Sequence, residues 1–306
     1  MNAVIQTENV TYRYRGVTAV RELELSVPEG SIYAFLGPNG AGKTTTIKLL
    51  MNLLQPSEGS AKVLGVDSTR LGPSEFARVG YVSENQQMPD WMTVEQLVAF
   101  CQPMYSTWDT AFCAKMLNDF QLPSDRKLKN LSRGMRMKAA LLVSLAYRPR
   151  LLVLDEPFTG LDPLVRDEVI HGILELTEQE KWSVFISSHD IDEVERLADY
   201  VGFIDGGRLQ LSEPVADLTA RMRRIDSVVP PGSRRAPMEP DSWLLPELGP
   251  RTFSVIDSQY TPEKSEQRLA TLIPGATQIT ATPLSLREVF VTLSRATRGK
   301  SQRLSS

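Results

Sequence analysis

GPNGAGKT, residues 37–44, stands between a short apolar run, SIYAFL at 31–36, and a helix-forming segment, KTTTIKLLMN at 43–52. It fits the pattern G-x-x-x-x-G-K-[ST] in the strand-then-helix setting that the pattern requires. Its glycines let backbone N–H groups converge on a phosphate chain, and the helix N-terminus adds a partial positive charge. The stretch predicts a phosphate-binding loop, because a chance glycine-rich turn would not explain the strand and the helix around it.

We expect this loop to bind ATP through its backbone and two side chains. Lys43 supplies a point charge to the β- and γ-phosphates, and the hydroxyl of Thr44 is a ligand for Mg²⁺. The expected ATP-binding residues of the loop are Gly37, Pro38, Asn39, Gly40, Ala41, Gly42, Lys43, Thr44 and Thr45.

Two carboxylates follow a second apolar run, LLVLDE at 151–156. Asp155, at the carboxyl end of the expected strand, is placed to hold Mg²⁺ directly or through water. Glu156 is placed to act as the base for the water that attacks the γ-phosphorus. Without the phosphate-binding loop, a strand that merely ends in solvated acids would be the simpler interpretation.

The chain contains two histidines, His171 and His189. His189 follows the expected strand 183–187, and from a strand end it can reach a γ-phosphate oxygen and sense its presence. On its own, however, a lone histidine is more often structural than catalytic. His171 falls in the helix expected at 163–180, and we assign it no role.

The pattern along the first two thirds of the chain predicts an α/β fold with a largely parallel sheet. Short apolar runs bounded by glycine, proline or acidic residues alternate there with helical patterns. The expected strands are Ser31–Leu36, Val79–Ser83, Leu151–Asp155, Ser183–Ser187 and Tyr200–Asp205. Between about 88 and 148 the strand pattern disappears, which indicates an inserted helical subdomain.

A second, smaller region follows the α/β part. Six prolines crowd residues 230–250, so we expect 216–250 to be a Pro-rich linker without regular structure. Residues 251–296 read as a small β-α-β-α, and hence α+β, accessory domain. Its expected strands lie at 253–257 and 277–282, one helix begins at Thr261, and a second helix has an apolar face around Leu286. The last segment, 297–306, reads as a polar tail.

Bulk properties narrow the function further. The net charge is −3 and the pI is about 5.6, so no basic field indicates nucleic acid as a partner. Cys101 and Cys113 are too far apart in the chain for a metal-binding spacing and read as reduced thiols. No apolar run approaches the roughly 20 residues of a membrane helix. We expect a cytosolic chain that, if it works at a membrane, relies on a partner for the spans.

Five motifs occur in a fixed order, and together they resemble the ATP-binding subunit of an ABC transporter. They are the phosphate-binding loop, Leu131-Ser132-Arg133-Gly134-Met135, the Asp155-Glu156 strand, Thr159-Gly160-Leu161-Asp162 and Ser188-His189. The resemblance covers about residues 4–215. It implies a P-loop NTPase fold with an additional antiparallel β portion, and an ATPase that dimerises head to tail around two ATP molecules.

The resemblance assigns roles to further residues. The LSGGQ-type signature segment, here 131–135, would cap the γ-phosphate bound by the other subunit, through the Ser132 hydroxyl and the Gly134 N–H. Tyr14 would stack on adenine, and Asp162 would communicate across the dimer. His189 would be the γ-phosphate switch.

Three positions depart from the family's pattern. Glu84 stands where a glutamine is usual, with Gln86 and Gln87 close behind. Its carboxylate can still touch Mg²⁺ or the attacking water, but would repel the γ-phosphate when the metal is absent. In the signature, Arg133 adds a cation beside the partner's nucleotide, and Met135 lacks an amide that could reach the ribose.

The resemblance also implies partners. The second ATPase subunit could be a copy of this chain or a relative, and a separate membrane permease would dock on residues 84–108, at the cytoplasmic face of the membrane. For the aromatic and Met-rich part, 88–108, ordinary core of the helical subdomain is an equal alternative. The signature substitutions and the Leu-x-x-Val-Phe helix at 286–290 favour drug, ion or glycan export, although the cargo and the direction of transport stay open.

Two other functions remain as alternatives. A soluble ABC ATPase acting as a switch on ribosomes or DNA would usually carry two cassettes or a long coiled coil, and we find one cassette and no heptads. A P-loop kinase would need a substrate lid and would have no use for the signature or for Ser188-His189.

Overall fold

The computed structural model describes residues 2–84, 86–231 and 242–304. The chain divides into two compact units, Met1–Ser212 and Glu213–Ser306. None of the described helices is both long and apolar enough to cross a membrane.

The first unit is built on a six-stranded sheet of order β11-β10-β4-β9-β8-β7. Its strands are β4 (Ile32–Leu36), β7 (Val79–Ser83), β8 (Leu151–Asp155), β9 (Ser183–Ser188), β10 (Tyr200–Asp205) and β11 (Arg208–Pro214). The pairs from β10 through β7 are all parallel, which confirms the predicted parallel sheet. Because parallel strands end at the same edge, β4, β8 and β9 bring the three predicted catalytic segments to one edge of the sheet.

A second, antiparallel sheet of order β2-β1-β5-β6, in which β3 also pairs with β1, confirms the expected antiparallel portion. Its strands are β1 (Ala3–Tyr14), β2 (Val17–Leu23), β3 (Ser26–Pro28), β5 (Glu58–Val63) and β6 (Val66–Asp67). Helix α1 (Lys43–Leu50) packs between the sheets, where Ile47 and Leu50 are fully buried with Phe35 of β4 and Val63 of β5. This apolar layer fixes the start of α1 beside the end of β4.

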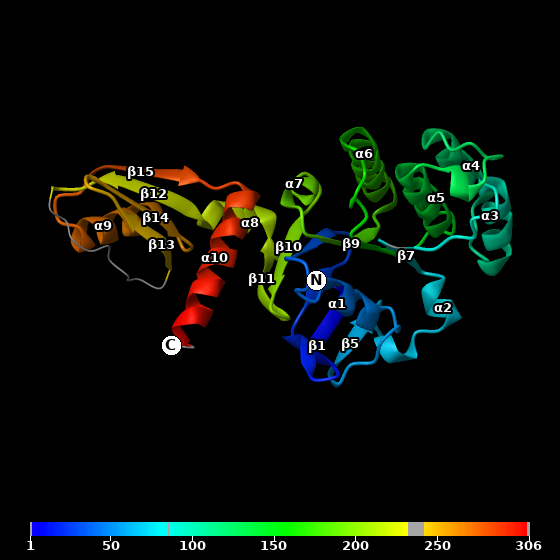
Figure 1. Ribbon diagram of the computed structural model, residues 1–306, viewed down its shortest axis with the longest axis horizontal. Coiled ribbons are helices and arrows are strands. Elements are labelled where there is room, and N and C mark those ends of the chain that lie inside the picture. Colours follow the sequence, from blue (N-terminus) through cyan, green and yellow to red (C-terminus); the bar gives the residue numbers. More distant parts are fainter. Residues whose placement is uncertain (1, 85, 232–241, 305–306) are drawn as a thin grey trace. The chain divides into compact units, whose positions relative to one another are not determined.

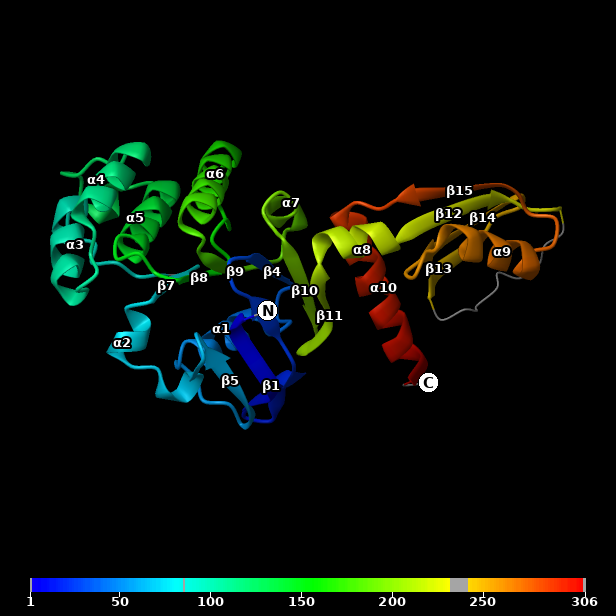
Figure 2. The same cartoon turned by 180° about the vertical axis from the view of Figure 1, so that it is seen from behind.

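Helices occupy the segment after β7, as the sequence predicts. They are α3 (Val94–Cys101), α4 (Thr110–Asp119) and α5 (Arg133–Leu145), with short turns η2 (Gln102–Met104) and η3 (Leu128–Asn130). Side-chain caps start all three: Thr93 for α3, Asp109 for α4 and Ser132 for α5. Figures 1 and 2 show α5 and α6 (Pro163–Glu180) on the opposite side of the central strands from α1. Shorter helical segments are η1 (Ser68–Arg70), α2 (Pro73–Phe76) and α7 (Ile191–Val194).

The second unit is an antiparallel sheet of order β13-β14-β12-β15 with three helices. Its elements are α8 (Val215–Arg221), β12 (Arg223–Val228), β13 (Trp243–Leu248), β14 (Thr252–Asp257), α9 (Pro262–Leu272), β15 (Thr277–Pro283) and α10 (Leu286–Leu304). Ile225, Trp243 and Phe253 form its core with Leu269 of α9. The predicted β-α-β-α order is therefore present from β14 onward.

The prediction of a structureless linker at 216–250 is wrong, because this segment contributes α8, β12 and β13. β12 is a central strand that ends at Val228, before the first of the prolines. Pro246 lies in β13, an edge strand, where the missing N–H costs no ladder bond. Pro237 and Pro240 lie outside the described residues.

The predicted polar tail at 297–306 overlaps α10, which runs to Leu304. The segment contains no proline, so its polar side chains do not end the helix that begins at Leu286.

Candidate active site

A cavity of about 380 Å³ lies at the carboxyl edge of the central sheet. It brings together the phosphate-binding loop and the ends of β7, β8 and β9. The lining residues are Ala19, Asn39, Gly40, Gly42, Lys43, Thr44, Thr45, Glu84, Glu156, Thr159 and His189.

The phosphate-binding loop depends on its glycines. Gly42 has φ +111°, and a Cβ there would lie 2.6 Å from the carbonyl oxygen of Ala19. A Cβ on Gly37 would lie 2.3 Å from the carbonyl oxygen of Ile204. Gly42 also offers no side-chain cap to α1. The first N–H groups of that helix are thus left for an anionic ligand.

Lys43 is buried, with 5% of its side chain exposed. Its Nζ donates to the carbonyl oxygen of Gly37 at 2.7 Å and lies 3.0 Å from Oε1 of Glu156. The latter contact is an ion pair without the alignment of a hydrogen bond. In this arrangement the ammonium holds both the loop and the predicted base.

Asp155 is buried at the end of β8. Its Oδ1 accepts from Oγ of Ser187 at 2.7 Å and from Oγ1 of Thr44 at 3.2 Å. Burial raises the pKa of Asp155, although both hydrogen bonds oppose that shift. Asp155 and Thr44 are hard oxygen donors side by side, the kind of set that Mg²⁺ takes together with phosphate oxygens and water. Among the described residues no three His, Cys, Asp or Glu side chains gather to form a metal site of protein ligands alone.

Glu156 has a left-handed backbone, with φ 51°, and its N–H donates to Oγ of Ser187 at 3.0 Å. Its Oε2 accepts from Oγ1 of Thr159 at 3.3 Å and lies 2.7 Å from Nδ1 of His189. Burial works against its charge, but the hydrogen bond from His189 and the ammonium of Lys43 hold the pKa of Glu156 below its ordinary value. The side chain is thus kept as a carboxylate that can accept a proton.

Of the described polar residues directly after β7, Glu84 lines the cavity and Gln86 and Gln87 do not. The side chain of Gln86 instead accepts from the N–H of Ser83 at 3.3 Å. Glu84 also lines a second, smaller cavity of about 90 Å³ together with Arg133 and Arg136. At the position where the family's pattern has a glutamine, this chain therefore has a carboxylate, that of Glu84, which lines both cavities.

No described residue that lines the 380 Å³ cavity belongs to 131–135. Ser132 caps α5 by accepting from the N–H of Met135 at 3.2 Å. Gly134 packs closely on α6, because a Cβ there would lie 2.4 Å from Cγ1 of Val165. The guanidinium of Arg133 lies so close to Gly160 that a Cβ on that glycine would be 2.4 Å from its NH1.

Six other predicted site residues are also absent from the described cavity lining: Tyr14, Gly37, Pro38, Ala41, Asp155 and Asp162. Tyr14 ends β1, is 43% exposed, and meets Tyr12 edge to face with 4.7 Å between ring centroids. Asp162 caps α6 by accepting from the N–H of Val165 at 3.1 Å.

Two hydroxyl groups of the site were not among the site residues predicted from the sequence. Ser187 lies opposite Asp155 in the register of β8 and β9, and Thr159 donates to Glu156. The signal for Ser187 was its place at a strand end beside Ser188-His189.

Comparisons with known proteins show which family the chain resembles. Residues 20–159 match the family model described as "ABC transporter". The chain is 30% identical over 226 residues to the bacitracin transport ATP-binding protein BcrA of Enterococcus faecalis, and the match covers 73% of each chain. It is 34% identical over 215 residues to the Nod factor export ATP-binding protein I of Cupriavidus metallidurans, covering 68% of this chain and 70% of that one.

The fold is similar to that of a solved bacterial ABC transporter cassette, the dimeric MJ0796. The TM-score is 0.63 at 21% identity, and the match covers 69% of this chain and 98% of that one. With its P-loop, its acidic strand end and these relatives, the chain belongs to the family of ABC transporter ATP-binding proteins and is an ATPase.

Proposed function

We propose that this chain is the motor subunit of an export system. Two ATPase subunits close around two molecules of ATP with Mg²⁺, and the cycle drives a separate permease from the cytoplasmic face of the membrane. The relative named for Nod factor export supports export as the direction, and the dimeric cassette with the same fold supports the assembly.

The observation that carries the proposal is the cluster of Lys43, Glu156 and His189 in one cavity. An incoming triphosphate competes with Glu156 for the ammonium of Lys43. Glu156, released from that pair, accepts a proton from the attacking water while His189 contacts the γ-phosphate. The water oxygen bonds to the γ-phosphorus as the bond to the bridging oxygen breaks, giving ADP, phosphate and a proton.

Thr44 and Asp155 are the residues that would hold Mg²⁺, with Glu84 as a third oxygen donor at the cavity wall. The metal would neutralise charge on the β- and γ-phosphate oxygens. This chain's own part is to keep both oxygens in place, through the hydrogen bonds from Ser187 to Asp155 and from Thr44 to Asp155.

The remaining site residues act between subunits in this proposal. Ser132 and Gly134 complete the partner's site, which is supported by their absence from the described lining of the chain's own cavity. Tyr14, exposed at the end of β1, stacks on adenine. Asp162, at the N-terminus of α6, relays the state of one site to the other.

The permease docks on the helical subdomain near 84–108. Trp91, Phe100 and Met104 support this surface, because they are 67%, 51% and 58% exposed. Other apolar residues of the same segment, such as Val94 and Leu97, are buried. The segment thus serves as core with one face and has an apolar surface left over on the other.

Features of a cassette that acts on ribosomes or DNA are missing from the described residues. The longest described helix between the phosphate-binding loop and the signature is α4, with 10 residues, which leaves no long coiled coil in that part.

The test is Glu156→Gln. The amide keeps the size of the side chain but cannot take the proton, so ATP should bind and the ATP-loaded dimer should accumulate while turnover falls about a hundredfold or more. Turnover and size-exclusion chromatography with ATP and Mg²⁺ measure both. Glu8→Gln, on an exposed position of β1, is the matched control. Turnover near that of the unmodified chain would show that another group is the base, with Glu84 as the first candidate.

A further inference from the structure

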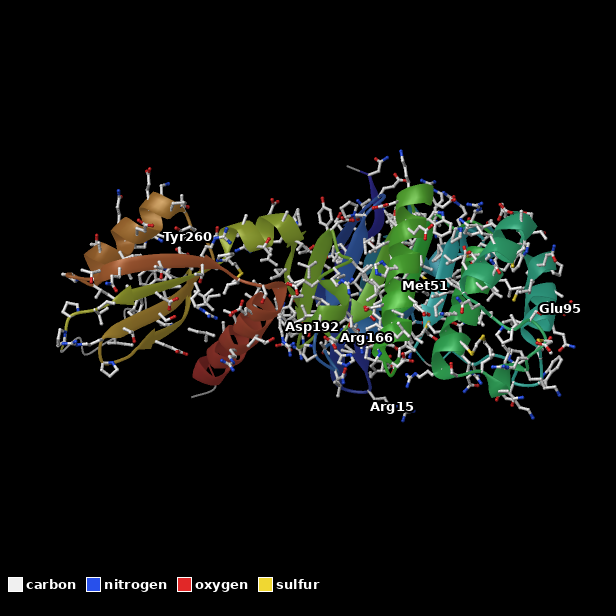
Figure 3. The ribbon with its side chains drawn as sticks, turned by 90° about the horizontal axis from the view of Figure 1, so that it is seen from above. Arg15, Met51, Glu95, Arg166, Asp192 and Tyr260 are labelled. Atoms are coloured by element: carbon white, nitrogen blue, oxygen red, sulfur yellow. The ribbon has the colours of Figure 1, made fainter. Side chains whose placement is uncertain are left out.

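Besides Asp155 and Glu156, another buried carboxylate lies next to the active site without lining its cavity. Glu193, on α7, has 5% of its side chain exposed. Its Oε2 accepts from Oγ of Ser188 at 2.9 Å, and its Oε1 lies 3.5 Å from NH1 of Arg166 on α6. Figure 3 labels Arg166 and, on α7, Asp192, the neighbour of Glu193 in the chain. One carboxylate therefore joins the end of β9 to the first turns of α6.

Ser188 connects Glu193 to the active site. Ser188 is the last residue of β9 and is fully buried. Its carbonyl oxygen accepts from the N–H of Gly37 at 3.3 Å, and its Oγ accepts from the N–H of Asp190 at 3.0 Å. Ser188 thus holds Asp190, the residue on the other side of His189. The Oγ of Ser188 also lies 3.1 Å from the carbonyl oxygen of Asp190, but the carboxylate of Glu193, at 2.9 Å, is the nearer acceptor for the hydroxyl proton.

Arg166 connects Glu193 to Asp162, the residue that caps α6. The N–H of Arg166 donates to the carbonyl oxygen of Asp162 at 3.0 Å in the first turn of α6. Its Nε is buried and has no hydrogen-bond partner among the described residues. A guanidinium with an unpaired buried N–H is expensive to hold, so the geometry is not optimised for stability alone.

Burial raises the pKa of Glu193, with Ser188 and Arg166 opposing the shift. A buried ion pair is weak support for stability, since desolvation consumes most of the attraction, and a better-attested use is to fix one arrangement of neighbouring parts. Here the parts are His189, which is proposed to contact the γ-phosphate, and α6, the helix that Asp162 caps.

We propose that Glu193 is a positioning residue that sets His189 in its place relative to α6. The inference rests on the proposed role of His189 at the γ-phosphate. Glu193 is not among the residues that line the cavity; it acts through the Ser188 hydroxyl and through Arg166.

The surface provides a matched control. Arg196, just after α7, pairs with Asp167 of α6 through a contact of 3.2 Å, and both side chains are more than half exposed. This pair joins the same two parts of the chain as Arg166 and Glu193, but it does not reach β9. Arg196→Gln therefore removes an exposed ion pair between the same two parts of the chain without affecting Ser188.

The first experiment compares Glu193→Ala, Glu193→Gln and Arg196→Gln in the full chain. Glu193→Ala should lower kcat between about tenfold and a hundredfold through a misplaced His189, with KM for ATP changed less than about threefold. Glu193→Gln keeps an acceptor for Ser188 and should recover part of that loss, while Arg196→Gln should leave kcat unchanged. A kcat for Glu193→Ala equal to that of Arg196→Gln overturns the proposal.

A double-mutant cycle separates positioning from a merely structural effect. If Glu193 acts through His189, adding Glu193→Ala to His189→Ala should change kcat less than about twofold, because the group it positions is gone. An undiminished loss in the His189→Ala background overturns the proposal. The same outcome would not contradict the proposed function, because the proposed function depends on the loss of kcat caused by His189→Ala itself.

Amide hydrogen exchange provides a reading that needs no turnover. Residues 189–192 should exchange faster in Glu193→Ala than in Arg196→Gln, since the hydroxyl that holds the Asp190 N–H has lost its anchor. Equal exchange in the two variants would contradict the proposal for Glu193, whether or not the chain hydrolyses ATP. A chain that hydrolyses no ATP would instead refute the proposed function.

Discussion

The ion pair of Lys43 and Glu156 places the phosphate-binding cation and the proposed base in contact within a buried site. Each is then the compensating charge of the other. Removing one charge leaves the other buried without its ion-pair partner, which costs more than the pair contributes.

A double-mutant cycle of unfolding free energies for Lys43 and Glu156, measured without nucleotide, tests whether the two charges depend on each other. Lys43→Met should lower the free energy of unfolding by about 3 kcal/mol, the usual cost of breaking a buried pair. Glu156→Gln should also destabilise, and the double variant should be closer in stability to the unmodified chain than Lys43→Met is. Denaturant unfolding of the four proteins measures this. Strictly additive losses would show that the two charges do not depend on each other.

Glu84 sits at the wall between two cavities and carries a negative charge toward the phosphate site. Glu84→Gln should tighten ATP binding when Mg²⁺ is absent, because repulsion of the γ-phosphate is removed. Hydrolysis should change only modestly. Equilibrium binding with and without a chelator measures the difference, and Glu95→Gln, at an exposed position of α3, is the control. An unchanged metal-free affinity would mean that Glu84 points away from the nucleotide.

The residue types of the site were predictable from the sequence, but their pairings were not. The P-loop, Asp155-Glu156 and His189 each carry a local motif. That Ser187 meets Asp155 depends on the register of β8 and β9, whose residues are 32 positions apart in the chain. A local pattern does not encode that register, and the contact of Lys43 with Glu156 likewise follows from the order of strands in the sheet.

At the level of secondary structure, buried parallel strands were the most predictable. Their continuous apolar runs differ from every neighbouring segment. β12 and β13 were missed because RRIDSV and WLLPEL mix charge or proline with apolar residues, and their strand state depends on pairing with β14 across the accessory sheet. The density of prolines therefore led to the wrong prediction of a linker at 216–250, because Pro246 is compatible with an edge strand.

The signature helix and the loop after Glu156 meet at Gly160. Its φ is +70°, and the Arg133 guanidinium fills the place of a Cβ. Gly160→Ala should therefore destabilise by about 1 kcal/mol or more from backbone strain and lower kcat further, because Arg133 and the loop that carries Thr159 must shift. Gly65→Ala is the matched control, with φ +83° but nothing within 4 Å of the added Cβ. Equal kcat in the two variants would remove any coupling through Arg133.

On the scale of the whole molecule, the proposed dimer would add the signature segment of one chain to the site of the other. The described lining contains phosphate-binding residues, the acidic strand end and His189 but nothing from 131–135. Ser132 instead stands at the N-terminus of α5, where its hydroxyl caps the helix. If the proposed dimer is correct, damage at Lys43 and damage at Ser132 fall in different composite sites of a mixed dimer.

Complementation between two inactive proteins tests this arrangement. Lys43→Ala weakens the chain's own phosphate site, and Ser132→Arg blocks the partner's. Mixed in equal amounts, the two should recover up to about one quarter of full turnover, because random pairing makes about half the dimers mixed and each has one intact site. Ser132→Arg also loses a helix cap worth about 1 kcal/mol, so its thermal stability and ATP binding are measured beside its turnover.

The decisive control places both substitutions in one chain and mixes it with the unmodified chain. If the signature acts in trans, every mixed dimer has one lesion in each composite site, and only the unmodified pairs, about one quarter of all dimers, remain active. If it acts in cis, the unmodified chain keeps its own site in every dimer, and about half of full turnover survives. Action in trans therefore predicts complementation between the two single variants and about one quarter of full turnover in the control. Action in cis predicts no complementation and about one half of full turnover in the control. The second outcome would refute the role in trans of Ser132 and Gly134, whatever coupling exists between the two sites.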